Sequence, residues 1–159
     1  NNSVYIRLTG DASINQVYED DYDFKIGKSI TLKKGKDISI FASGTMVKVA
    51  LDCSKILSKN NIDSEVVNVH TIKPIDSNKV NESAKNSKLI VSIEEHNVIG
   101  GLGSAIAECL VGIKNSPEQI FFGVNDSYSE GGDYNFLKEK FNLTPDFISK
   151  KIISKLKDI

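Results

Sequence analysis

Short apolar runs alternate along the chain with longer stretches in which apolar residues recur every three or four positions. The run Ile38–Ala42 is followed by such a stretch from Met46 to Leu57, which ends at Lys59-Asn60-Asn61 and predicts a strand followed by a helix. The alternation continues downstream, with strands expected at 65–69, 89–93 and 120–124 and helices at about 78–84, 102–111, 134–141 and 145–156. Strands that alternate with helices predict an α/β fold, a three-layer sandwich around a mostly parallel sheet of about five strands.

The first part of the chain follows a different pattern. Residues 30–32 and 38–42 are apolar runs separated by charged residues and a glycine, which favours a hairpin and supplies one antiparallel edge strand. Residues 11–29 are polar and irregular and predict a linker. Residues 3–8 form a short β-rich run. We therefore expect three parts, at 1–10, 11–29 and 30–159.

Composition narrows the class of protein. The chain has 159 residues, 40% hydrophobic and 26% charged residues and a formal net charge of −1. This length fits one globular core, and the balanced charge gives no reason to expect nucleic acid or an anionic membrane as a partner. Cys53 and Cys109 lack zinc-ligand spacing, so we expect no metal site and a reduced, cytoplasmic location. The start resembles neither a signal peptide nor an initiator Met, which favours an internal piece of a longer protein.

Glycines mark two junctions at which a strand gives way to a helix. Gly100, Gly101 and Gly103 precede the helix expected at 102–111, whose free N–H groups could bind an anion. The pattern is not the full dinucleotide fingerprint, and we prefer the alternative that these glycines pack tightly against a neighbouring surface. Gly44 and Thr45 form a junction of the same kind without the lysine of a P-loop.

Two histidines fall at the ends of predicted strands. His70 and His96 would lie at the carboxyl edge of the sheet, where ligands bind in open α/β folds. Glu94 and Glu95 could raise the basicity of His96 by hydrogen bonding. No nucleophile elbow occurs, and a structural or interface hydrogen bond explains the histidines better than catalysis. We assign no catalytic residue.

Two further features carry polar chemistry. Arg7 lies in a short apolar run, where a guanidinium needs an anionic partner unless it points into solvent, and solvent is the preferred interpretation from these residues alone. Lys73-Pro74-Ile75-Asp76 is interpreted as a turn followed by a helix cap.

Several of these segments, in this order and spacing, resemble the C-terminal portion of transketolase, and especially the C-terminal subunit of split transketolases. The matching residues run from about Ser3 to Ile148 and include the following stretches: Tyr5-Ile6-Arg7-Leu8, Gly35-Lys36-Asp37-Ile38, Ser43-Gly44-Thr45-Met46, His70-Thr71-Ile72-Lys73-Pro74-Ile75-Asp76, Glu94-Glu95-His96-Asn97 and Gly100-Gly101-Leu102-Gly103-Ser104. Deoxyxylulose-phosphate synthase and the beta subunits of 2-oxo acid dehydrogenases share this domain.

The resemblance implies an enzyme that uses thiamine diphosphate and magnesium to move two-carbon ketol units between sugar phosphates of the pentose phosphate pathway. It implies that residues 1–10 are the last strand of a pyrimidine-binding domain and that Arg7 binds substrate phosphate. Both cofactors would bind upstream, and the domain at 30–159 would be structural, at an interface of a homodimer or heterotetramer, and inactive alone. The edge that carries Gly44, His96 and Gly100–Gly103 would face the rest of the enzyme. A regulatory module that binds an anion or nucleotide remains an alternative.

Overall fold

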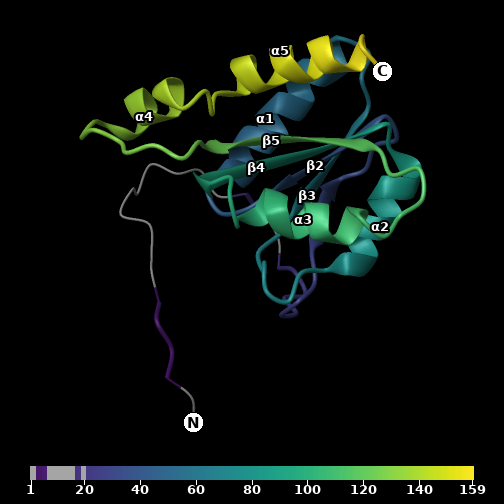
Figure 1. Cartoon of the computed structure of the whole chain (residues 1–159), viewed down its shortest axis with the longest axis horizontal. Helices are drawn as coiled ribbons and strands as arrows, with labels where there is room; N and C mark the ends of the chain where they lie inside the picture. Colours follow the sequence, from purple (N-terminus) through teal and green to yellow (C-terminus); the bar gives the residue numbers. More distant parts are fainter. Residues whose placement is uncertain (1–2, 7–16, 19–20) are drawn as a thin grey trace.

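The computed structural model describes residues 3–6, 17–18 and 21–159 of the chain. These residues form five strands and five helices, which alternate along most of this length; Figure 1 shows their arrangement. The elements are β1 (Ile30–Lys33), β2 (Ile38–Ala42), α1 (Met46–Lys59), β3 (Ser64–Asn68), α2 (Ser77–Asn86), β4 (Leu89–Asn97), α3 (Leu102–Leu110), β5 (Glu118–Val124), α4 (Tyr134–Lys140) and α5 (Pro145–Leu156). Among the described residues, no helix is long and apolar enough to cross a membrane.

The five strands form one sheet in the order β1-β3-β2-β4-β5. β2 pairs in parallel with β3 and with β4, β4 pairs in parallel with β5, and β1 is an antiparallel edge strand on β3. This confirms the mostly parallel α/β sandwich. The predicted hairpin is wrong, because β3 lies between β1 and β2. All five residues of β2 are buried, as a central strand with a neighbour on each side requires.

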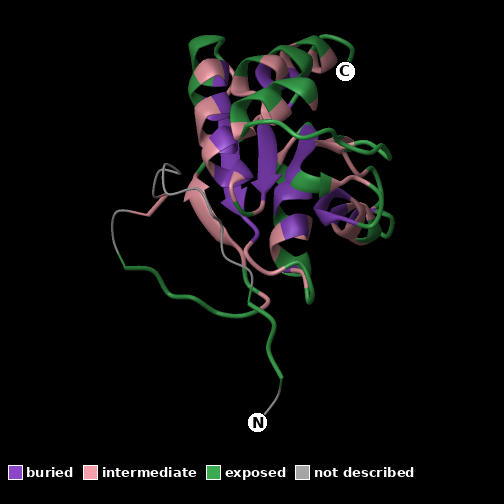
Figure 2. Cartoon of the chain, turned by 90° about the vertical axis from the view of Figure 1, so that its left-hand side faces the viewer, coloured by how far each residue is buried: buried purple, intermediate pink, exposed green. Residues whose placement is uncertain are grey.

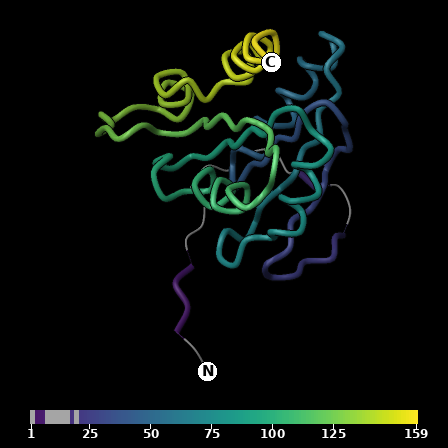
Figure 3. Tube along the Cα trace, turned by 45° about the vertical axis from the view of Figure 1, so that its right-hand side comes forward, coloured from purple at the N-terminus to yellow at the C-terminus, as the bar shows by residue number. Residues whose placement is uncertain are grey.

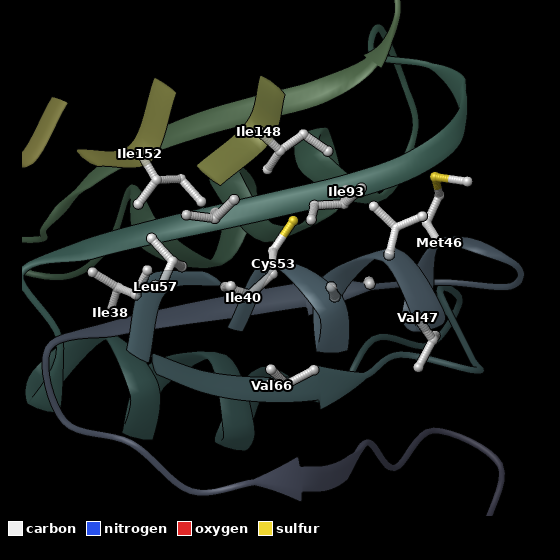
Figure 4. Packing of buried hydrophobic residues seen from close by; sticks show 14 of the residues in the cluster. Ile38, Ile40, Met46, Val47, Cys53, Leu57, Val66, Ile93, Ile148 and Ile152 are labelled. Atoms are coloured by element: carbon white, nitrogen blue, oxygen red, sulfur yellow. The ribbon is translucent and has the colours of Figure 1, made fainter. Parts of the chain in front are cut away.

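Helices cover both faces of the sheet. In Figure 1, α1 and α5 lie above the strands, while α2 and α3 lie below them. Figure 2 shows that burial concentrates in the strands between these layers. Figure 4 shows the upper core, in which Met46, Cys53 and Leu57 of α1 meet Ile40 of β2 and Ile148 of α5. The apolar stripe predicted for α1 therefore faces the sheet, as expected for an amphipathic helix.

Side chains fix the starts of three helices. The Asp76 carboxylate accepts the Lys79 N–H at the start of α2, which confirms the predicted helix cap. Thr144 caps α5 as the sequence predicts, with Pro145 in the first turn. Asp133 caps α4 in the same way. The tube in Figure 3 shows the segment between β5 and α4 reaching beyond the body of the domain before the chain returns through α5.

The described residues of the predicted linker lie against the domain. The Tyr18 hydroxyl accepts a hydrogen bond of 2.5 Å from the Asn68 amide at the end of β3. Burial raises the pKa of the Tyr18 phenol, and this hydrogen bond opposes the rise. Further along, the Ser29 N–H donates to the second oxygen of Asp76 at 2.9 Å, so one carboxylate joins the end of this segment to α2.

Candidate functional site at the strand ends

The candidate residues gather at the carboxyl ends of the parallel strands, which we call the strand-end edge: residues 43–45 after β2, 70–71 after β3 and 94–103 at the end of β4. The chain leaves β2 for α1 on one face of the sheet and leaves β4 for α3 on the other face. Because β2 and β4 are neighbours, a topological switch point lies between them. In open α/β sheets, such a point is where ligands usually bind.

Glu94 occupies the α3 side of this switch point. Its side chain is almost fully buried, at 1% exposure, and its carboxylate accepts the N–H of Leu102 at 2.7 Å and the N–H of Gly103 at 2.8 Å. These are free donors of the first turn of α3, where the helix dipole favours a negative charge. The anion at this helix terminus is therefore a side chain of the chain itself.

The glycines of the turn make room for that carboxylate. A Cβ on Gly101 would lie 1.9 Å from the Glu94 Oε2 and 2.7 Å from the Asn97 carbonyl oxygen. Gly100 has a φ of +76°, a conformation that favours glycine. Two residues further on, a Cβ on Gly103 would lie 2.2 Å from the Phe121 ring of β5. The preferred sequence interpretation, tight packing, thus matches the geometry inside the domain.

Glu95 lies on the opposite side of the sheet from Glu94, because successive side chains of a strand point to opposite faces. Its carboxylate accepts hydrogen bonds from the Thr45 hydroxyl beside α1 and from the Tyr134 hydroxyl of α4, the latter at 2.8 Å. Gly44, next to Thr45, has a φ of +56° and no atom within 4 Å of a notional Cβ. Glu94 therefore joins β4 to α3 on one face of the sheet, and Glu95 joins β4 to Thr45 and Tyr134 on the other face.

The histidines have different surroundings from those predicted. His96 is exposed and lies within β4, and its Nδ1 is 3.0 Å from the Asn97 carbonyl oxygen. The prediction that Glu94 or Glu95 bonds to His96 is wrong, because both carboxylates bind other groups. The His70 Nδ1 is 2.9 Å from the Thr71 hydroxyl, and its ring lies 4.4 Å from the ring of Phe24. These are structural contacts rather than a catalytic pair.

An apolar surface lies beside the capped turn. A cavity of about 490 Å³ separates the loop after β3 from α3, and Ile72, Ile75, Gly101 and Cys109 are among its lining residues. Ile72 is 40% exposed, and Ile99 on the loop after β4 is 69% exposed. The two exposed isoleucines make these loops a candidate surface for contact with another part of the protein. Arg7, the predicted phosphate ligand, lies outside the described residues.

The described residues do not form a binding site for magnesium or for a diphosphate. Within them, no group of three or more His, Cys, Asp or Glu side chains could hold a metal ion. The helix terminus best suited to a diphosphate already binds Glu94. The described part of the chain therefore does not fit either group.

Fold and edge together define a class of protein: an α/β domain whose strand-end switch point is occupied by its own carboxylates. Residues 27–146 match the model of the transketolase C-terminal domain. The chain belongs to this family, which confirms the resemblance seen in the sequence.

Individual relatives agree with this assignment. A subunit of 6-deoxy-6-sulfo-D-fructose transketolase from Clostridium sp. (strain MSTE9) is 44% identical over 142 residues, which cover 89% of this chain and 43% of the relative. A 1-deoxy-D-xylulose-5-phosphate synthase from Dictyoglomus turgidum is 37% identical over 135 residues, 85% of this chain and 22% of that enzyme. A solved structure described as a split gene transketolase, inactive beta4 tetramer, has a TM-score of 0.84 at 37% identity and covers 91% of this chain and 47% of that one. The chain thus spans less than half the length of these relatives.

Proposed function

We propose that this chain is the C-terminal part of a transketolase subunit that acts with a separate N-terminal subunit. The complete enzyme would transfer two-carbon ketol units between sugar phosphates with thiamine diphosphate and magnesium. The match of residues 27–146 to the transketolase C-terminal domain carries this proposal. Both cofactors would bind to upstream residues or the partner subunit, because the described residues fit neither. We also propose a cytoplasmic location, with which the two free cysteines are consistent.

Within that enzyme, we infer that the domain is structural and that its strand-end edge faces the remaining parts. The first N–H groups of α3 are bound internally by Glu94, and the hydroxyls of Thr45 and Tyr134 by Glu95, which leaves these groups unavailable to a substrate. What the edge offers outward is the apolar surface of Ile72 and Ile99 and the exposed ring of His96. Such a surface suits packing against a protein partner better than binding a small anion.

The activity is tested with the complete enzyme, reconstituted from this chain, its upstream residues and the N-terminal subunit, in the presence of thiamine diphosphate and magnesium. Two ketose donors are offered to ribose 5-phosphate in parallel: xylulose 5-phosphate and 6-deoxy-6-sulfofructose, the sugar in the name of the Clostridium relative. We expect ketol transfer from at least one donor and none by the 159-residue chain alone. Turnover of pyruvate instead would assign the protein to the deoxyxylulose-phosphate synthase or 2-oxo acid dehydrogenase branch.

The interface is tested separately with Ile99→Asp and His96→Ala in the complete enzyme. We expect Ile99→Asp to weaken subunit association at least tenfold, because it buries a charge in an apolar contact. Tyr128→Asp, at a fully exposed position outside the edge, is the matched control. Unchanged association and activity in both edge variants would show that the edge faces solvent.

A further inference from the structure

The free edge of β5 is a second surface that the domain leaves open. β5 is last in the strand order and pairs only with β4, so within the described part of the chain one side of this strand has no partner. A cavity of about 460 Å³ lies along it. Ile120, Phe121 and Phe122 of β5 and Phe147 and Lys151 of α5 are among its lining residues.

This cavity lies between the free edge of β5 and α5, which supplies Phe147, Lys151 and Lys155 to its lining. Phe121 points to the α3 face, because its ring is what a Cβ on Gly103 would meet. Ile120 and Phe122 point to the other face, where they pack against the core beneath α1 and α5. The consecutive residues 120–123 all line the cavity, so it runs along the strand on its unpaired side. A segment that fills it would lie next to the N–H and C=O groups of β5 that point away from β4.

The two edges of the sheet differ in how they are protected. β1 has only four residues, an irregular register between Thr31 and Lys33, and a lysine on the strand. Short length, bulges and lysines are the usual means of preventing edge-to-edge pairing. β5 has seven residues, and the positions after Glu118 carry neither charge nor proline. Phe121 on this strand is 41% exposed. β1 therefore has features that prevent the addition of another strand, whereas β5 lacks them.

We propose that β5 pairs antiparallel with β5 of a second copy of this chain, about a two-fold axis at Phe121, to form one sheet through both copies. The two Phe121 rings then stack, and Ile120 lies opposite Phe122 of the second copy. Glu118 lies opposite Val124, so the only charge on each strand is at the far end of the ladder from its counterpart. The strand is therefore complementary to itself, as a two-fold interface requires.

The first experiment measures the mass of the 159-residue chain by light scattering and sedimentation over a concentration series. We expect a reversible dimer. Phe121→Lys should weaken it at least tenfold, because two like charges would then face each other across the ladder. Tyr128→Lys introduces the same charge at an exposed aromatic residue away from β5 and should leave the dimer unchanged. Thermal unfolding of each variant confirms that it is folded.

The second experiment tests the two-fold register itself. Val124→Lys should strengthen the dimer, because it places a positive charge opposite Glu118 of the second copy, and Glu118→Gln in the same chain should cancel that gain. Glu118 is exposed and Val124 is half-buried at the end of the strand, so both changes leave the core intact. A chain that stays monomeric up to about 1 mM would overturn the proposal. A dimer that is indifferent to Phe121→Lys, or that Val124→Lys does not strengthen, would overturn it equally.

Discussion

The buried carboxylate of Glu94 provides the sharpest test of how the strand-end edge is built. Replacement by Gln keeps the shape of the side chain and one acceptor oxygen but removes the charge. The amide group would then face one of the two N–H groups that Glu94 now accepts, those of Leu102 and Gly103. Because the side chain is 1% exposed, water cannot replace the lost acceptor without rearrangement.

The magnitude follows from these contacts. A buried N–H left without a partner costs about 1–3 kcal/mol. Loss of a negative charge at a helix N-terminus adds up to about 2 kcal/mol where the group is buried. We therefore expect Glu94→Gln to lower the free energy of unfolding by about 2–4 kcal/mol. For a domain of this size each kcal/mol lowers Tm by about 2–4 °C, so the loss is easily measured by urea or thermal unfolding.

Hydrogen exchange locates the effect. In Glu94→Gln, the amides of Leu102 and Gly103 should exchange faster than in the native protein, whereas those in α5 should change only as global stability does. Glu108→Gln, at an exposed position of the same helix, is the control and should stay within about 0.5 kcal/mol. If Glu94→Gln also unfolds within about 0.5 kcal/mol of the native protein, the internal cap does not stabilise this edge and the reasoning is refuted.

Three further predictions follow from single contacts. Gly103→Ala should lose about 1–3 kcal/mol in urea unfolding, because its Cβ would lie 2.2 Å from the Phe121 ring; no loss would mean that the ring moves freely. Burial raises the pKa of the Cys53 thiol from 9.0 to about 12, so its stabilising contribution should be present below pH 9 and lost between pH 9 and 12. Thiol reagents should accordingly label Cys53 at pH 8 only after unfolding, and rapid labelling of the folded chain would contradict this. Asp76→Ala should cost about 0.5–2 kcal/mol as a lost helix cap and speed exchange of the Ser29 amide, which a purely local cap would leave unchanged.

The elements were predictable from the sequence because their signals are local. The helical spacing that ends at Lys59, and the Thr144-Pro145 start of the last helix, depend on neighbours within a few residues. Strand order was not predictable in the same way. The runs at 30–32 and 38–42 have the spacing of a hairpin, and only the insertion of β3 between them, a long-range choice, separates them.

At the candidate site, the sequence predicted the close packing of the glycines but not the carboxylate against which they pack. Glycines before α3 indicated close packing, and the structure contains that packing. The close packing is required by the carboxylate of Glu94. The sequence suggested a hydrogen bond between Glu94 and His96 instead, because the two residues are close in sequence. Strand alternation offered the missing signal: in a run buried on both faces, Glu94 follows five buried residues and points into the domain, whereas Glu95 points to the other side. A carboxylate that continues a buried strand just before a helix is a candidate cap for that helix.

Occupation of the switch point by two glutamates limits what this edge of the sheet can bind. An α/β sheet normally offers free helix N–H groups at this place, and here the donors of α3 and the hydroxyls of Thr45 and Tyr134 all bind carboxylates of β4. An incoming phosphate would have to displace a buried charge of its own sign, which costs more than surface binding returns. The surfaces left for contact are the loops that carry the exposed Ile72 and Ile99, and the edge of β5 with the exposed Phe121. If the proposed structural role is right, substitutions on these surfaces should alter assembly before they alter chemistry.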